Sequence, residues 1–209
     1  MRRIPHFLVA FVLVLESSCH SSSVPDLRNT PEVNLTLGGA LFTSILYNMP
    51  IGSTAQSLIP RLTRDSAVMR FNTGSRLFRD SVVYPWLPGL VTYSSPDSNQ
   101  VYPIYLVTFL RDTCIDVTLV DSTFDDEHVL SCVRLANSVC GPFLFEHRHT
   151  HHFYNPGFTI TEHEVDLYHA QHGSLEISME YRRGSGLFTF IISDTTRSYP
   201  IARRFGFSP

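Results

Sequence analysis

The sequence predicts an α+β domain made mainly of antiparallel β-strands, a sandwich-like sheet with one main helix at about residues 125–140. Three observations carry this prediction. Short β-branched and aromatic runs alternate with turns rich in proline, glycine, asparagine and aspartate. One longer segment has its apolar residues at helical spacing. The 209 residues are 43% hydrophobic and 17% charged, which is enough apolar material for one core.

The first half of the chain is predicted to form short strands bounded by turn residues. Residues 55–62 could instead form a short helix that is interrupted at Pro60. The clearest pair in this half is a hairpin whose turn is Arg111-Asp112-Thr113. The predicted strands are Leu41–Tyr47, Ser66–Phe71, Ser81–Tyr84, Leu90–Tyr93, Tyr102–Leu110 and Cys114–Val120.

The main helix is predicted from its capping and its spacing. Acidic residues occupy the first turn, apolar residues follow at intervals of three and four, and Gly141 supplies a C-terminal stop. Four further strands follow the helix, and the last two are joined by a glycine-rich turn. These strands are Phe143–Phe153, Phe158–Tyr168, Leu175–Tyr181 and Leu187–Ser193. With no repeat and no linker in the pattern, residues 34–209 are expected to be a single β-rich domain.

The N-terminus predicts export. Arg2 and Arg3 precede the nine-residue apolar run Phe7–Leu15, and small residues follow it, so residues 1–19 are expected to be a cleaved signal peptide. Residues 20–33 are rich in serine and proline and are expected to be a flexible leader. Asn34-Leu35-Thr36 is a glycosylation sequon, so Asn34 is expected to carry a sugar on a secreted chain.

The cysteines predict a disulfide. Cys132 and Cys140 would be separated by about 12 Å of helical rise, whereas a disulfide tolerates only about 7 Å between α-carbons. Cys114 is therefore expected to pair with Cys132 or Cys140. The remaining cysteine is buried, paired with Cys19, or free to form a bridge to another molecule.

Composition and motifs exclude several classes of protein. The net charge is −3, and the sixteen basic residues are all arginine, so the chain is lysine-free and lacks the basic surface of a nucleic-acid binder. No stretch approaches the ~20 apolar residues of a membrane span. The sequence also lacks GxSxG, a phosphate-binding loop and HExxH, so no common enzyme signature is present.

A histidine-rich hairpin is the unusual feature of the sequence. Seven of the ten histidines lie between residues 147 and 172. Centring the turn on Pro156-Gly157 pairs residues whose numbers sum to 313. Strand alternation then places three imidazoles on one face opposite three carboxylates. The predicted pairs are His147 with Asp166, His149 with Glu164, and His151 with Glu162.

Three interpretations of this hairpin compete. The first is a polar sheet face stabilised by cross-strand pairs. The second is a pH sensor, because the nine histidines of the mature chain would move its net charge from −4 to +5 between about pH 7 and pH 5. The third is a site for zinc or another divalent metal, in which His147 and His149 are completed by His151 or Glu162.

The function expected from these features is that of a secreted glycoprotein that binds another extracellular or host-surface protein. Tyr84 and Trp86 lie in a proline-rich loop and could supply aromatic anchors, although core packing is the alternative for both. An exported domain without enzyme signatures suits a viral or pathogen factor in host interaction. The alternative function is a metal-dependent extracellular enzyme with a His147/His149/His151 site.

Overall fold

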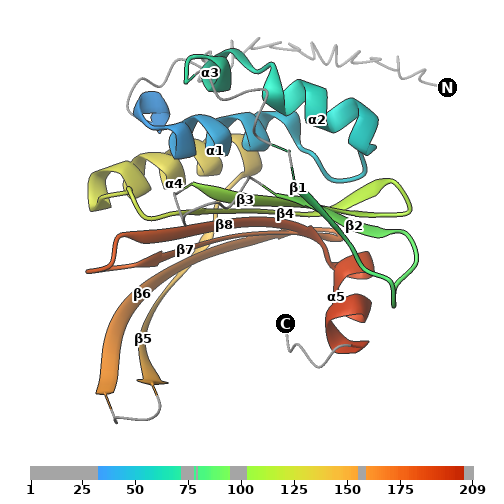
Figure 1. The fold of residues 1–209 in the computed structure, drawn as a ribbon. Coiled ribbons are helices and arrows are strands. Elements are labelled where there is room, and N and C mark those ends of the chain that lie inside the picture. Colours follow the sequence, from blue (N-terminus) through green and yellow to red (C-terminus); the bar gives the residue numbers. More distant parts are fainter. Residues whose placement is uncertain (1–32, 72–77, 79, 95–102, 155–158, 205–209) are drawn as a thin grey trace, which may run out of the picture.

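The fold is an eight-stranded antiparallel sheet with most of its helices packed on one face and the C-terminal helix on the other (Figure 1). The structure, a computed structural model, describes residues 33–71, 78, 80–94, 103–154 and 159–204. The helices are η2 (Val33–Leu35), α1 (Leu37–Asn48), α2 (Ala55–Thr63), α3 (Ser66–Met69), α4 (Asp126–Cys140) and α5 (Thr195–Arg204). The strands are β1 (Asp80–Val83), β2 (Leu90–Ser94), β3 (Ile104–Leu110), β4 (Thr113–Asp121), β5 (Leu144–Tyr154), β6 (Thr159–His172), β7 (Leu175–Arg182) and β8 (Leu187–Asp194).

The sheet consists of two four-stranded meanders that meet at its centre. Its strand order is β1-β2-β3-β4-β8-β7-β6-β5, and the meanders join where β4 pairs with β8. Helix α4 carries the chain from the centre of the sheet to the start of β5 at the far edge. In Figure 1, α1, α2, α3 and α4 lie above the sheet, whereas α5 lies on the other side. The β5–β6 hairpin curves away beyond the helical layer.

The predicted fold class is confirmed, and so are the predicted helix at 125–140 and the strands from residue 81 onward that the structure describes. The described strands form one sheet, and helices occupy the layer that a second sheet would fill in a sandwich. The short helix at residues 55–62 is also confirmed, as α2 with Pro60 inside it.

Two predicted strands are wrong. Leu41–Tyr47 lies in helix α1, and residues 66–69 of Ser66–Phe71 form helix α3. Helix α1 is buried from Gly38 to Leu46, so it has no exposed polar face over that stretch and lacks the amphipathic period of a surface helix. A short, fully buried apolar run cannot be assigned to a helix or a strand by periodicity alone.

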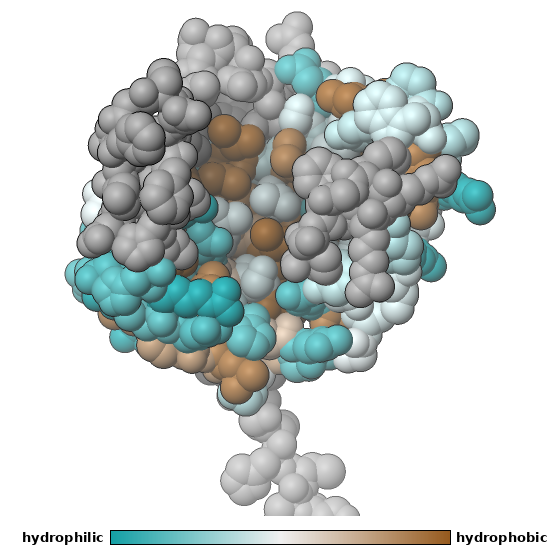
Figure 2. Space-filling view, turned by 90° about the horizontal axis from the view of Figure 1, so that it is seen from below, coloured by the Kyte–Doolittle hydropathy of each residue, from teal (hydrophilic) through white to brown (hydrophobic). Residues whose placement is uncertain are grey.

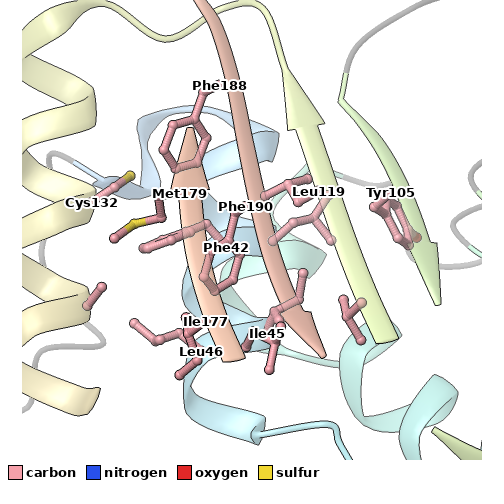
Figure 3. Packing of buried hydrophobic residues seen from close by; sticks show 14 of the residues in the cluster. Phe42, Ile45, Leu46, Tyr105, Leu119, Cys132, Ile177, Met179, Phe188 and Phe190 are labelled. Atoms are coloured by element: carbon pink, nitrogen blue, oxygen red, sulfur yellow. The ribbon is translucent and has the colours of Figure 1, made fainter. Parts of the chain in front are cut away.

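The core lies between α1, α4 and the upper face of the sheet. Phe42 of α1 points toward Phe188 and Phe190 of β8, as Figure 3 shows, with ring centroids 6.0 Å and 4.6 Å away. All three side chains are fully buried. On β3, β4, β7 and β8, alternate residues face this core, whereas the residues between them face the opposite side of the sheet.

Glycine allows α1 to begin close to its neighbours. The Thr36 hydroxyl accepts a hydrogen bond from the Gly39 N–H at 3.0 Å and caps the helix. A Cβ on Gly39 would lie 1.6 Å from the Val33 carbonyl oxygen, and one on Gly38 would lie 1.7 Å from Asp121 Oδ2. Only glycine permits this approach, so the two residues fix where α1 sits on the sheet.

The predicted disulfide is absent: Cys114, Cys132 and Cys140 are free thiols. Cys114 opens β4, and burial raises the pKa of its thiol to about 12. Burial also raises the pKa of Cys132, with a further contribution from the charge of Asp121 at the other end of β4. Asp121, near Cys132, is seven residues along β4 from Cys114. Seven residues of strand span about 23 Å, so Cys114 and Cys132 are too far apart to form a disulfide. Cys140 lies at the end of α4 beside Met49 and His172.

The predicted export features fall largely outside the described residues. The signal peptide at 1–19 and the leader at 20–33, apart from Val33, are among the residues that the structure does not describe. Asn34 lies in η2, but its side chain is not described, so its glycosylation stays a prediction. Within the described ranges, no helix is both long enough and apolar enough to cross a membrane.

Truncating Phe42 tests the packing of α1. We expect Phe42→Ala to lower the free energy of unfolding by about 3–5 kcal/mol, because it removes a fully buried ring and leaves a cavity. The matched control is Leu130→Ala on α4, where the side chain is 52% exposed, and a change within about 0.5 kcal/mol is expected. Urea denaturation measures both, and equal costs would contradict this account of the core.

Candidate metal centre

The β5–β6 hairpin has the register that the sequence predicts. His147 pairs with Asp166, His149 with Glu164, and His151 with Glu162. The predicted turn at Pro156-Gly157 lies outside the described residues, and so do the side chains of His151 and Glu162. Alternation places His147, His149, Glu164 and Asp166 on the helical side of the sheet, beyond the end of the helical layer.

Asp166 holds the first imidazole in place. His147 Nδ1 lies 2.7 Å from Asp166 Oδ1, and Arg183 donates to Oδ2 with its nitrogens 2.8 Å and 2.9 Å away. Asp166 is only 3% exposed, so water hardly competes for its oxygens. Each oxygen of this carboxylate is thus held by a side chain of its own, His147 on Oδ1 and Arg183 on Oδ2. With Nδ1 facing that carboxylate as donor, the free nitrogen of His147 is Nε2.

His149 and Glu164 complete a set of three possible metal ligands. One ligand atom from each of His147, His149 and Glu164 lies within 4.8 Å of the other two, and all three residues are exposed. The rings of His147 and His149 are 5.1 Å apart and nearly perpendicular. Tetrahedral zinc requires ligand atoms roughly 3.4 Å apart, given bonds near 2.1 Å. Small rotations of these exposed side chains would bring the ligand atoms from within 4.8 Å to that separation.

The donor set and its support suit a borderline metal ion. Two imidazoles and one carboxylate are the ligand types that Zn²⁺ prefers, and three protein ligands leave one position open. Metal-binding histidines usually donate their second ring N–H to a carboxylate, which fixes the tautomer and strengthens the ligand. Asp166 has this relation to His147. In the structure the third candidate ligand is therefore Glu164, whereas the sequence predicted His151 or Glu162 in that role.

Arg183 is a functional residue that sequence reasoning missed. It lies in the turn between β7 and β8, where its backbone N–H donates to the Glu164 carbonyl at 2.9 Å. Its guanidinium then reaches Asp166 from the side opposite His147. The only signal in the sequence is the pair Arg182-Arg183 in a glycine-rich turn. The order of the strands, which brings β7 next to β6, was needed to place it.

Tyr84 and Trp86 lie apart from this centre, at the opposite edge of the sheet. Trp86 is 60% exposed, and its ring contacts that of the half-buried Tyr84 with centroids 5.4 Å apart. Val82 and Val83 of the edge strand β1 are 52% and 64% exposed. These four residues are called the β1-edge surface below. Trp86 is therefore on the surface, where the alternative of core packing would have hidden it.

Comparison with known proteins gives no relative for this chain. No protein-family model, no curated protein and no solved structure matches it. The function of this chain is therefore inferred from the metal centre and the β1-edge surface themselves.

Proposed function

We propose that the protein binds a divalent transition metal, zinc in the first instance, at His147, His149 and Glu164. The observation that carries this proposal is the bond from His147 to the buried Asp166, which orients an exposed imidazole beside two further ligands. A stable polar sheet face would not require that a buried carboxylate be shared between His147 and Arg183. The pH-sensor interpretation stays a prediction.

A zinc ion at this centre would supply Lewis-acid chemistry at its open position, as the predicted extracellular enzyme would require. The residues of this chain would hold the ion, orient it through Asp166 and leave its outer side accessible. We further propose that this happens outside the cell, because residues 1–19 have the pattern of a signal peptide.

A second candidate function is recognition of an extracellular or host-surface protein through the β1-edge surface. Its support is the exposure of Trp86 and of Val82 and Val83, which project from the two faces of the edge strand, since exposed large apolar side chains often mark a contact. The edge strand β1 could also accept a strand from a partner, because β2 is its one neighbour in the described sheet.

Zinc titration tests the first proposal. We expect isothermal titration calorimetry of the full mature chain to show one Zn²⁺ per molecule with a dissociation constant of roughly 10 µM or lower. His147→Ala and His149→Ala should each weaken binding by about a hundredfold or more. His169→Ala is the matched control, because His169 is an exposed histidine of β6 on the other face of the sheet. Unchanged affinity in the two site variants would contradict the proposal.

Replacing Asp166 tests the orienting role of its carboxylate. We expect Asp166→Asn to weaken zinc binding by about 10- to 100-fold, because the amide cannot hold His147 in the same charged hydrogen bond. Thermal unfolding of the same sample, without zinc, separates this effect from loss of the fold. A folded variant that binds zinc as the wild type does would show that Asp166 has a structural role only.

Capture from cell surfaces tests the second proposal. We expect the biotinylated protein to capture one surface protein reproducibly. The Trp86→Ala variant should not capture it, because tryptophans that become buried on binding contribute much of the binding free energy of an interface. Leu130→Ala removes a comparably exposed apolar side chain from α4 and should retain the partner. Capture that survives Trp86→Ala and Val83→Thr would place the contact elsewhere.

A further inference from the structure

The face of the sheet opposite α1 and α4 is a hollow whose middle combines hydroxyl-bearing and aliphatic side chains. Figure 2 views the molecule from this side and shows apolar and pale residues in a depression, with hydrophilic residues along its lower side in this view. In Figure 1, α5 and the curved β5–β6 hairpin lie to either side of it. We call this surface the open face. Its middle is lined by short hydroxyl and aliphatic side chains, namely Thr92, Thr108, Thr118, Ser178, Ser193, Leu106 and Ile191.

One carboxylate on this face differs from the others. Glu180 is paired with Arg182 at 2.8 Å, Glu146 with Arg148 at 2.7 Å, and Glu176 accepts a hydrogen bond from Tyr199. Asp116, in the middle of β4, accepts a hydrogen bond from the Thr118 hydroxyl at 3.1 Å, and none of the cationic side chains that the structure describes forms an ion pair with it. Glu180 and Glu146 thus have arginine partners, whereas the central Asp116 has a hydroxyl alone.

The surroundings of Asp116 are poor in solvent. Thr108 of β3 and Ser193 of β8 are its register partners on the neighbouring strands. Burial raises the pKa of its carboxyl to about 6, and the hydrogen bond from Thr118 opposes that rise. A carboxylate in such a place costs free energy unless an opposite charge joins it. A bound cation would recover that cost.

The side chains around Asp116 define what kind of cation fits. Thr108 and Ser193 lie one strand spacing, about 4.8 Å, to either side of Asp116, and their hydroxyls can accept hydrogen bonds. The Thr118 hydroxyl, two residues along β4, lies 3.1 Å from the Asp116 carboxylate. One row further along the sheet, Leu106 and Ile191 flank Thr118. That row lies roughly 7 Å from the Asp116 row, so a charged head and a short apolar body would meet complementary surfaces.

We propose that the open face binds a small organic ammonium ion, with its ammonium group on Asp116 and its apolar body over Leu106 and Ile191. The ammonium donates to the carboxylate and to the neighbouring hydroxyls, and the body covers the apolar floor. This site is separate from the metal centre, which lies on the other face of the sheet, and it stands whether or not zinc binds there.

The test compares an amine with its neutral analogue. 2-Phenylethylamine and 2-phenylethanol have the same shape, and only the amine is charged at pH 7.5. We expect calorimetry or NMR titration of the wild type to show the amine binding at about 1 mM or tighter and the alcohol about tenfold weaker. Equal affinities, or no amine binding below about 10 mM, would overturn the proposal. This comparison needs no variant to fold.

A matched pair of variants then locates the charge. Asp116→Asn should lower the affinity for 2-phenylethylamine at least about tenfold and leave 2-phenylethanol unchanged. Glu180→Gln, on the same face but paired with Arg182, should leave both within about twofold. Amine binding that is indifferent to Asp116→Asn, or equally sensitive to Glu180→Gln, contradicts the assigned counter-ion.

The affinity should also follow the ionisation of Asp116. Because its pKa is about 6, the carboxylate is present above that pH and is protonated below it. We expect wild-type affinity for the amine to fall about tenfold between pH 7.5 and pH 5. The other described charges near this end of the face are Glu176, held by Tyr199, and Asp194 with Arg197 of α5. Asp116→Asn should abolish the pH dependence of amine affinity. If the affinity of this variant still changed with pH, the dependence would come from Glu176, Asp194 or Arg197 instead.

Discussion

The structure depends on one constraint: α1 and α4 cover one face of the sheet and bury alternate residues of its central strands. Because strand residues alternate, this packing assigns each position of those strands to the core or to the open face. Phe188 and Phe190 face α1, whereas Ile191, between Phe190 and the next core residue, faces the other way. A slip by one residue in any central strand would exchange the two sets, so packing against α1 also fixes the register.

The same alternation explains how the metal centre arises from an ordinary hairpin. The β5–β6 hairpin continues the sheet beyond the helices that cover the core (Figure 1). Along β6, Asp166 is still buried, whereas Glu164, two residues nearer the hairpin turn, is exposed. The boundary between covered and uncovered sheet thus lies between these acids. Asp166 is shielded from water and holds His147 by a hydrogen bond, whereas Glu164 is exposed and can bind a metal ion.

Local pattern was sufficient wherever alternation or capping carried the information. The pairing of His147 with Asp166 followed from alternation and the Pro156-Gly157 turn, and α4 followed from its acidic first turn and Gly141. Helix α1 could not be predicted in this way, because burial on all sides removes the amphipathic signal. Arg183 and the missing Cys114 bridge depend on which strands are neighbours and how far apart their ends lie, and these distances are tertiary properties.

The two aspartates at the candidate sites illustrate how the partners of a carboxylate determine what it can do. Asp166 receives His147 on one oxygen and Arg183 on the other, so its charge is compensated within the chain and it acts by positioning a neighbour. Asp116 receives one hydroxyl, and burial leaves its charged form costly. A compensated acid makes a rigid support, whereas an acid without a charged partner can gain free energy from a ligand of opposite charge. The difference in hydrogen bonding therefore assigns the two acids different roles.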